Sequence, residues 1–424
     1  MSRNKSESKT LLVTRIVIFV VIAAALLISL IWRPQIESML GIRSENETDY
    51  DGMSTDAVLS GSGGDLNLHF VDVGQGDACI VELPDGRNML IDSGKSDKDD
   101  KLISYIDENI KGDDGKTITH FDIVILTHPD EDHCGEMADV LGRFPVSEMF
   151  YRPNQEATRS GFTDPGKEDF YGDYNGKNTK AYASAIEAGY KGGAKGIITD
   201  AANDEINVIT PKDAKAGDED YYKINFYSPL SAQYDDYNNY SPIIVLEYND
   251  NRVALSGDAE KEAEAEFVAK AKEGDGRYSV FTDDFTVQAI KLGHHGSRTS
   301  SSEDYLEVMT TAASRPDVRV IISCGKDNKY GHPHAEVLTR LKEMGFSEKN
   351  ILRTDVNGTV AMSIKFDKES GGYALFFGAD VVRTETSVSL GAIELNWLQI
   401  VIVAIVLSAV ILFVLPLLPK KRRR

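Results

Sequence analysis

The central part of this 424-residue sequence predicts an α/β fold, with sheets packed together and helices outside, and each end predicts one transmembrane helix. Three observations support the prediction. Between residues 66 and 380, apolar segments of strand length alternate with amphipathic segments of helix length. The strand-rich segments fall into two halves that helices separate. Uncharged apolar runs occupy residues 16–32 and 397–418, each near the roughly 20 residues that a membrane helix needs.

Both apolar runs have basic flanks. Residues 1–15 precede the first run and residues 419–424 follow the second, and basic flanks stay in the cytoplasm. We therefore predict cytoplasmic termini and an extracytoplasmic central domain at the cell membrane. A cleavable signal peptide is the alternative for the first run, and a buried core helix is the alternative for the second. An uncleaved anchor is preferred because the first run continues past its alanines to Trp32.

Polar segments separate the membrane runs from the domain, residues 65–383. Residues 33–64 predict a flexible linker, because residues 44–65 are polar and rich in Ser, Gly and Asp, and residues 384–396 predict a shorter stalk. Within the domain, residues 152–223 contain a stretch nearly devoid of aliphatic side chains. This stretch predicts a long surface excursion, either a lid that faces the substrate or, preferably, solvated decoration.

Strands and helices of the domain are predicted from the periodicity of their apolar residues. The predicted strands are LNLHFVDV (66–73), NMLIDS (88–93), FDIVILT (121–127), INFYS (224–228), PIIVLEY (242–248), RVALSG (252–257), TVQAIKL (286–292), VRVIIS (318–323), TVAMSIKF (359–366) and YALFF (373–377). The predicted helices are DDKLISYIDENI (99–110), EKEAEAEFVAKAKE (260–273), SSEDYLEVMTTA (301–312) and HAEVLTRLKEMG (334–345). In the last helix Val337 and Leu341 share one face, and Gly345 stands where a C-cap is expected.

The charge of the chain is strongly negative. The net charge is −21, and because residues 1–32 carry +3 and residues 397–424 carry +5, residues 33–396 carry −29. Such a surface repels polyanions at long range, which argues against unaided, non-specific binding of nucleic acid. A local basic patch within it is still compatible with the composition.

The cysteines are few and widely spaced. Cys79, Cys134 and Cys324 are an odd number, so they predict small buried residues rather than a disulfide framework. Cys134 directly follows a histidine of the motif described next and is the one cysteine that could lie near a metal.

The stretch ILTHPDEDHCGE, residues 125–136, ends an apolar strand with His128, Asp130, Asp132 and His133. Functional residues commonly stand just past the carboxyl end of such a strand, and a tight loop can direct several of these side chains at metal ions. The alternative is a solvated acidic turn. Four potential ligands within six residues favour a metal site.

Three other strands of the pattern end in potential ligands. VALSGDAE presents Asp258, AIKLGHHGS presents His294 and His295, and NKYGHPHAE presents His332 and His334. Together with the first motif, these clusters contain six of the eight histidines of the chain, which packing alone does not explain. Two alternatives remain: Asp258 caps the following helix, and one histidine of the adjacent pair only hydrogen-bonds to a ligand.

These motifs, together with the aspartate at the end of LIDSG, resemble a metallo-β-lactamase-fold hydrolase. More narrowly, VDVGQGDA, THPDEDHCGE, NNYSPIIVLEY, LSGDAE, LGHHGS and NKYGHPH, in this order, are similar to the extracytoplasmic hydrolase domain of ComEC-type DNA-internalisation proteins, the competence proteins. The resemblance covers residues 66 to about 380 and implies a four-layer αββα sandwich with metals at one edge between the sheets. The multi-span channel of that family does not fit in this chain, which has room for two spans.

The resemblance implies a dinuclear centre. One metal would be held by His128 and Asp130, the other by Asp132 and His133, and Asp258 would bridge the two. One of His294 and His295, with His295 preferred, would complete the second site.

The resemblance also implies residues around the metals. Asp92 would be a buried carboxylate that orients the metal loop. His332 would protonate the leaving group, and His334 would contact the substrate. Asn239 and Ser241 are further candidates for a substrate contact or for completing the first metal site.

The sequence departs from the wider fold at the first metal site. That fold usually has a histidine where Asp130 stands and a further histidine before the bridging aspartate, whereas no histidine occurs between residues 134 and 293. The site is therefore richer in oxygen ligands, which shifts the preference toward manganese relative to zinc. We expect two divalent ions, zinc or manganese.

The expected function is phosphodiester hydrolysis, with DNA as the first candidate substrate. A bridging hydroxide would be the nucleophile, positioned by Asp132 and Asp258. The charge of −29 argues against a processive nuclease and leaves wall polymers and small phosphodiesters as candidates. The alternative is a catalytically silent, membrane-tethered binding or scaffold module. A third hypothesis, that the protein hydrolyses β-lactams, is supported only by the name of the fold.

Overall fold

The computed structural model describes the central domain and one pair of strands beyond it. The described residues are 53–59, 64–96, 99–112, 114–167, 179–202, 207–231, 233–368 and 370–380, with the paired strands Val388–Leu390 (β16) and Ile393–Leu395 (β17). The chain divides into two compact units, and residues 50–382 form the unit that contains both large sheets. The β16–β17 pair lies within the predicted stalk.

The predicted membrane helices, residues 16–32 and 397–418, lie outside the described residues. Among the residues that are described, no helix combines the length and apolarity needed to cross a bilayer. The predicted linker is partly wrong, because its residues 55–59 form a helix, α3 (Thr55–Leu59), whose Val58 is fully buried. Met53 also forms a parallel bridge with Gly378, so this part of the predicted linker belongs to the domain.

Eight strands form the first sheet, in the order β15-β14-β1-β2-β3-β4-β5-β6. The strands from β3 to β6 are parallel, and the strands from β15 to β3 are antiparallel. The bounds are β1 (Leu66–Phe70), β2 (Cys79–Glu82), β3 (Asn88–Ile91), β4 (Phe121–Ile125), β5 (Val146–Arg152), β6 (Lys195–Ile198), β14 (Val360–Asp367) and β15 (Gly372–Ala379).

Seven strands form the second sheet, in the order β13-β12-β11-β10-β9-β8-β7. Here the strands from β10 to β13 are parallel and the strands from β7 to β10 are antiparallel. The bounds are β7 (Val208–Ile209), β8 (Tyr222–Phe226), β9 (Ile244–Tyr248), β10 (Asn251–Leu255), β11 (Ala289–Lys291), β12 (Arg319–Ile322) and β13 (Ile351–Arg353).

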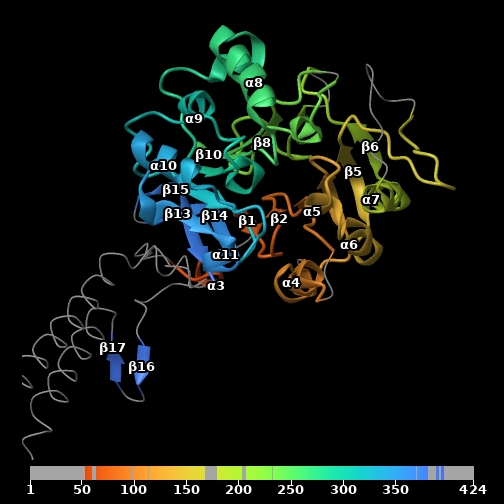
Figure 1. Ribbon diagram of the computed structural model, residues 1–424, viewed down its shortest axis with the longest axis horizontal. Coiled ribbons are helices and arrows are strands. Elements are labelled where there is room, and N and C mark those ends of the chain that lie inside the picture. Colours follow the sequence, from red (N-terminus) through yellow and green to blue (C-terminus); the bar gives the residue numbers. More distant parts are fainter. Residues whose placement is uncertain are drawn as a thin grey trace, which may run out of the picture. The chain divides into compact units, whose positions relative to one another are not determined.

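Helices cover the outer faces of both sheets (Figure 1). Their bounds are α4 (Lys101–Asn109), α5 (Glu131–Cys134), α6 (Met137–Arg143), α7 (Lys180–Lys191), α8 (Lys261–Glu273), α9 (Glu303–Met309), α10 (Ala335–Met344) and α11 (Thr354–Asn357). Short 3-10 helices are η2 (Tyr237–Tyr240), η3 (Gly276–Val280), η4 (Gly293–Gly296) and η5 (Glu348–Asn350). The four long helices predicted from the sequence correspond to α4, α8, α9 and α10.

Three apolar cores hold these elements together. The first lies between the sheets, and Leu68 of β1 and Leu246 of β9 both belong to it. The second packs α8, α9 and α10 against the second sheet, and the third packs α4, α6 and α7 against the first. Alternation along each strand divides its side chains between two cores, so that Val253 lies between the sheets and Ala254 faces α8. The predicted α/β fold with two packed sheets is confirmed.

The prediction for residues 152–223 is wrong for much of this region. Its described part contains β6, β7 and α7, and Tyr182 and Ile186 of α7 are fully buried in the third core. The helix was missed because small residues make its apolar face inconspicuous. At Gly189 a Cβ atom would lie 2.3 Å from the Phe150 ring, so this close approach of α7 to β5 requires glycine.

Candidate metal centre

Polar side chains from both sheets meet at one edge of the domain. Asp92 follows β3, the loop with His128 and His133 follows β4, Asp258 follows β10, and His295 follows β11. Each of these strands is parallel to a neighbour, and parallel strands present their carboxyl ends at a common edge. The sequence motifs therefore converge because the strands before them run in the same direction.

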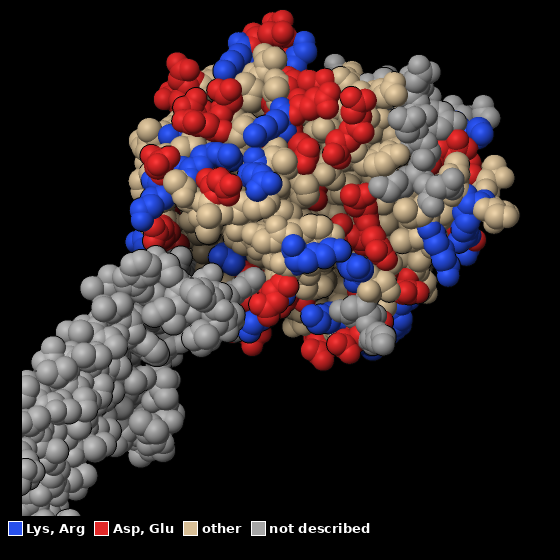
Figure 2. Space-filling view, viewed as in Figure 1, with Lys and Arg blue, Asp and Glu red and all other residues tan. Residues whose placement is uncertain are grey.

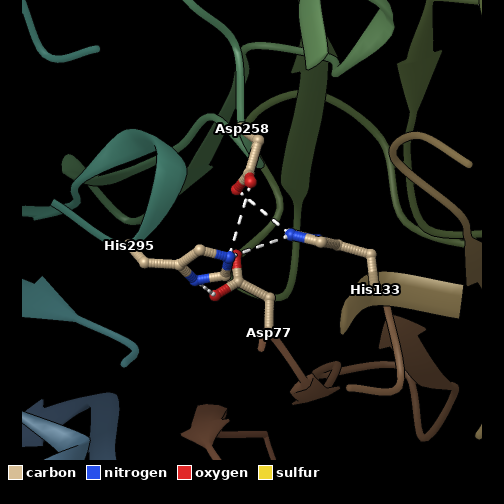
Figure 3. Close-up of side chains that lie close together, drawn as sticks. All are labelled: Asp77, His133, Asp258 and His295. Carbon is tan, nitrogen blue, oxygen red and sulfur yellow. Dashed lines mark hydrogen bonds and ion pairs between the residues drawn. The ribbon is translucent and has the colours of Figure 1, made fainter. Parts of the chain in front are cut away.

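The Asp258 carboxylate points toward His133 and His295 (Figure 3). Its Oδ1 atom is 3.2 Å from Nε2 of His133, and its Oδ2 atom is 3.4 Å from Nε2 of His295. The Nε2 atoms of His294 and His128 lie 3.7 and 3.9 Å from the same Oδ2 atom. Ligands at about 2.0–2.2 Å from a common ion are separated by about 3–3.5 Å, so these separations suit shared metal ligands.

The remaining predicted metal ligands border this centre. Oδ2 of Asp132 is 3.4 Å from Nε2 of His295, and Oδ2 of Asp130 is 4.0 Å from Nε2 of His128. The structure thus brings all seven predicted ligands into one network of close contacts: His128, Asp130, Asp132, His133, Asp258, His294 and His295.

The surroundings of His128 provide a test of whether a cation fits. Its ring is fully buried, and its Nδ1 atom lies 3.1 Å from Oγ1 of Thr127 and 3.2 Å from Oγ of Ser241. Within the described part of the chain, its Nε2 atom has no hydrogen-bond partner. Buried polar atoms are nearly always satisfied, and this one faces two carboxylates. A divalent cation between these groups therefore fits the residues present.

Asp92 makes the contacts of an orienting carboxylate. Its Oδ2 atom is 2.7 Å from Nδ1 of His133, so that Nε2 of the same ring faces Asp258. It also accepts hydrogen bonds from the backbone N–H of Thr127 at 2.9 Å and from the hydroxyl of Thr127 at 2.6 Å. A carboxylate behind a histidine fixes the tautomer and direction of that ring.

Asp77 and Lys291 are two residues that sequence reasoning missed. Asp77 belongs to the buried group of potential ligands with His133, Asp258 and His295. Its Oδ1 atom, however, lies 3.3 Å from Nδ1 of His295, whereas Nε2 of that ring faces Asp258. Nδ1 of His295 lies closer, at 2.9 Å, to the carbonyl oxygen of Ser323, which therefore orients this ring, and Asp77 pairs with the buried Lys291 ammonium.

Two sequence signals could have identified this pair. Gly74 and Gly76 stand just before Asp77, and a Cβ atom on Gly76 would lie 2.3 Å from the carbonyl oxygen of Asp132. The glycine therefore allows the turn to approach the metal loop. Lys291 is a lysine at the end of the apolar strand segment AIK, three positions before His294, and a buried lysine requires a partner.

The electrostatics of the cluster follow from carboxylates and imidazoles buried together. Burial alone would lower the pKa values of His133 and His295, but the carboxylates of Asp258, Asp92 and Asp77 outweigh it. The pKa of His133 therefore lies well above its usual value, and that of His295 rises to about 10. Burial would conversely raise the pKa of Asp258, yet the surrounding histidines hold it well below its usual range.

His128 behaves in the opposite way. Its burial and the neighbouring His133 lower its pKa, and the more distant carboxylates do not compensate. At neutral pH the metal-free cluster thus contains the neutral imidazole of His128 beside the protonated imidazoles of His133 and His295. A metal would replace the protons of the latter, since a histidine ligand is neutral.

His332 and His334 lie beside the cluster. The His332 ring stacks on His295 with centroids 5.9 Å apart, and its centroid is 5.4 Å from that of His294. Burial and the neighbouring histidines lower the pKa of His332 to about 4, so this ring is neutral at pH 7. The His334 ring is 4.9 Å from the His332 ring, and its Nδ1 atom accepts a hydrogen bond from the backbone of Arg298.

Asn239 and Ser241 were predicted to contact substrate or to complete the first metal site, and their environments contradict an open substrate contact. Both are buried. The Asn239 carbonyl oxygen accepts backbone N–H groups of Glu260 and Ala263 at the start of α8. The Ser241 hydroxyl lies beside His128 and accepts the backbone N–H of Asp258 at 3.1 Å. These short polar side chains satisfy buried donors instead of facing solvent.

The cysteine prediction is confirmed. Cys79, Cys134 and Cys324, all within the described residues, are buried and form no disulfide. Burial raises the pKa of the Cys134 thiol to about 12, and its sulfur lies 3.5 Å from the carbonyl oxygen of Pro129. This thiol is therefore protonated at neutral pH, and it donates its S–H group to a backbone carbonyl.

Comparisons with known proteins give consistent results. The model of the metallo-beta-lactamase superfamily matches residues 71–322. The chain is 27% identical over 317 residues to ComE operon protein 3 of Bacillus subtilis (strain 168), an alignment that covers 70% of this chain and 33% of that protein. It is 25% identical over 303 residues to Recombination protein 2 of Haemophilus influenzae (strain ATCC 51907 / DSM 11121 / KW20 / Rd), covering 70% of this chain and 29% of that protein.

Among solved structures, the metallo-beta-lactamase fold protein YhfI from Bacillus subtilis matches with a TM-score of 0.37 and 11% identity, over 69% of this chain and 98% of that chain. The chain spans about a third of the length of the two curated relatives named above.

Proposed function

Because the chain belongs to the metallo-beta-lactamase superfamily and is distantly related to ComEC-type competence proteins, we propose that it is a metal-dependent phosphodiesterase, with DNA as the first candidate substrate. The observation that supports this function most is the convergence of seven histidine and aspartate side chains around Asp258. His128, His133, Asp258 and His295 are buried, and Asp92 orients His133. Nε2 of His128 faces carboxylates and has no hydrogen-bond partner among the described residues.

The residues divide into two ligand sets. His128 and Asp130 would hold one divalent ion, zinc or manganese, and Asp132, His133 and His295 would hold the other. Asp258, which contacts members of both sets, would belong to both. Such ions, when bound, supply Lewis-acid chemistry that activates water and stabilises charge developing on a phosphoryl group.

The role of His332 changes from the one expected. A histidine whose pKa is lowered to about 4 does not carry the proton that a general acid needs at pH 7. A neutral imidazole still donates one N–H group. We assign His332 to hold the substrate through a hydrogen bond to a phosphoryl oxygen, at the edge of the ligand cluster where its ring contacts His294 and His295.

The location is proposed from the sequence. Apolar residues 16–32 and 397–418 with basic flanks support two membrane anchors, cytoplasmic termini and an extracytoplasmic domain. Tags on either terminus should be shielded from protease in intact cells, while the domain between them should be cleaved. Protection of the domain in intact cells would contradict this orientation.

The catalytic proposal is tested with the full-length protein in detergent and purified without chelator. We expect hydrolysis of single-stranded or double-stranded DNA with added manganese or zinc, and its loss in Asp132→Ala and His128→Ala at unchanged circular dichroism. The matched control is Asp304→Ala, an exposed acid in the first turn of α9. Unchanged turnover in both ligand variants would overturn the proposal, and the absence of bound transition metal would favour a silent scaffold module.

A further inference from the structure

A series of stacked rings leads from the ligand cluster to the surface. The Tyr330 ring stacks on His332 with centroids 5.7 Å apart and planes 20° apart, and His332 stacks on His295 at 5.9 Å and 28°. His332 is 6% exposed, whereas Tyr330 is 52% exposed. A single exposed aromatic residue needs no explanation by itself. This one, however, continues a stack that starts at a metal ligand.

The loop that carries Tyr330 is held in place by side-chain hydrogen bonds. The Asn328 amide donates to the carbonyl oxygens of Gly325 at 2.9 Å and His332 at 2.7 Å, and it accepts the backbone N–H of His332 at 2.9 Å. Gly331 has a φ of 77°, which favours glycine directly after Tyr330. The Tyr330 ring is therefore presented in a defined position, which suits recognition of a ligand.

Cationic side chains lie on this loop and beside His334, although the domain as a whole is acidic. The Lys329 ammonium lies 5.1 Å from the centroid of Tyr330, and Lys326 is exposed on the same loop. Arg298 is exposed beside His334, with its guanidinium 4.0 Å from the Glu336 carboxylate. On the face shown in Figure 2, basic side chains lie in small groups among acidic ones. Local cations of this kind can contact a phosphate without a basic stripe.

A second observation points to a ligand at the same place. His332 is buried, and within the described residues its Nδ1 atom has no hydrogen-bond partner. This unsatisfied atom belongs to the ring between Tyr330 and His295. A polar group of a bound substrate would satisfy it.

We propose that Tyr330 stacks on a base of a single-stranded polynucleotide, next to the phosphodiester that the cluster attacks, while Lys329 and Arg298 contact the flanking phosphates. This inference rests on the proposed function and adds the strand specificity. Aromatic side chains bind single strands because the base faces are open, whereas in a duplex those faces are covered by neighbouring bases. A stacked base would take the place of the flexible Lys329 side chain over the ring and leave its ammonium for a phosphate.

The test compares base-bearing and abasic single strands of equal length. We expect Tyr330→Ala to lower kcat/KM for the base-bearing strand about tenfold relative to the abasic strand, mainly through KM. Tyr330→Phe and Tyr330→Trp should keep the wild-type ratio, because both keep a ring. The matched control is Phe366→Ala, an aromatic residue on β14 that is 51% exposed and packs against Tyr373, and it should leave the ratio unchanged.

Each other outcome overturns the inference. An equal loss on both strands would indicate a purely structural role of Tyr330, and an unchanged ratio would exclude stacking. A duplex cleaved as well as the single strand would exclude the strand specificity. If no phosphodiester is hydrolysed, the proposed function fails separately. In that case, fluorescence anisotropy with manganese-loaded protein tests the stacking on its own. Tighter binding of the base-bearing strand that is lost in Tyr330→Ala would support stacking. Equal binding of both strands would overturn it.

Discussion

Two regions of the domain bury charged side chains, and they satisfy them differently. The Arg152 guanidinium forms a two-pronged pair with Asp164, at 2.5 and 2.7 Å. Asp164 also accepts backbone N–H groups of Ala157 and Gly166, and both charged side chains are fully buried. Around Asp258, in contrast, carboxylates and histidines crowd together while Nε2 of His128 has no hydrogen-bond partner among the described residues.

The difference separates a structural site from a functional one. In the Arg152–Asp164 pair the chain itself compensates the buried charge, so the pair needs no ligand and holds the segment after β5. The Asp258 cluster is balanced within the chain only by protonating histidines that must be neutral to bind metal. Buried charge that the chain balances by itself is expected to matter for stability, and buried charge balanced only by protons is expected to matter for ligand binding.

The largest effect is expected from Asp258→Asn. The substitution keeps the size of the side chain but removes the charge that four imidazoles face. We expect metal-dependent hydrolysis to fall by about a thousandfold or more, as for loss of a central electrostatic group, together with the bound metal. Assays with metal analysis of the same sample check this. A variant that keeps its metal and its activity would remove the distinction between the two regions.

Arg152→Ala should lower the stability of the fold instead of metal binding. Removing one partner of a buried pair leaves Asp164 uncompensated, which costs about 3–5 kcal/mol in free energy of unfolding. Denaturant unfolding measures this loss, and the metal content of the folded protein should be unchanged. Arg159→Ala is the control, because the Arg159–Glu187 pair is partly exposed and is expected to contribute about 0–1 kcal/mol. Equal costs for both variants would contradict the role assigned to burial.

A smaller effect is expected from Asp92→Asn. Asparagine preserves the size of the side chain and tolerates the φ of 57° at this position, but it weakens the contact with Nδ1 of His133. We expect metal affinity to fall by about 10–100-fold, measured by competition with a chelator. Asp122→Asn is the matched control, since Asp122 accepts the backbone N–H of Asn88 and contacts no predicted ligand. An unchanged affinity in Asp92→Asn would show that the loop needs no orienting carboxylate.

A further effect concerns the dependence of stability on pH. The folded-state pKa of His295 is raised above its unfolded value, to about 10, so its protonation stabilises the metal-free protein below pH about 6.5. That contribution is lost as the pH rises from about 6.5 toward 10. We expect the Tm of chelated protein to fall over this window by about 2–4 °C for each kcal/mol lost. Metal-loaded protein should lack this slope, because its histidines are already neutral, and a slope shared by both forms would contradict the assignment.

Much of the fold follows from local pattern. The hairpin of β9 and β10, the pair of β14 and β15, and the four predicted long helices all appear, because alternation and helical periodicity are properties of consecutive residues. The helix α7 was missed because Tyr182 and Ile186 are embedded among alanines and glycines. Its burial depends on how closely α7 approaches β5, and this contact is not encoded in any local period.

The candidate ligands were also predictable, since each stands at the end of an apolar strand and the motifs resemble those of a known family. The resemblance put Asp132, His133 and one of His294 and His295 in one site. The individual contacts come from the structure, in which Oδ2 of Asp132 lies 3.4 Å from Nε2 of His295, a residue of the other sheet. The resemblance predicted that Asp92 orients the metal loop. The contacts of Asp77 with Lys291 and His295, in contrast, follow only from the packing of β2 and β11 against the metal loop.

The sequence by itself determined which residue types stand at the ends of the strands, because these motifs are short and continuous. Tertiary structure alone decided which of them touch: Asp77 with His295, Asp132 with His295, and His133 with Asp258. Contacts of this kind depend on the direction and spacing of strands from two sheets, and on which side chains the cores leave at the edge. Burial then sets the pKa values, since only the folded protein removes these groups from water.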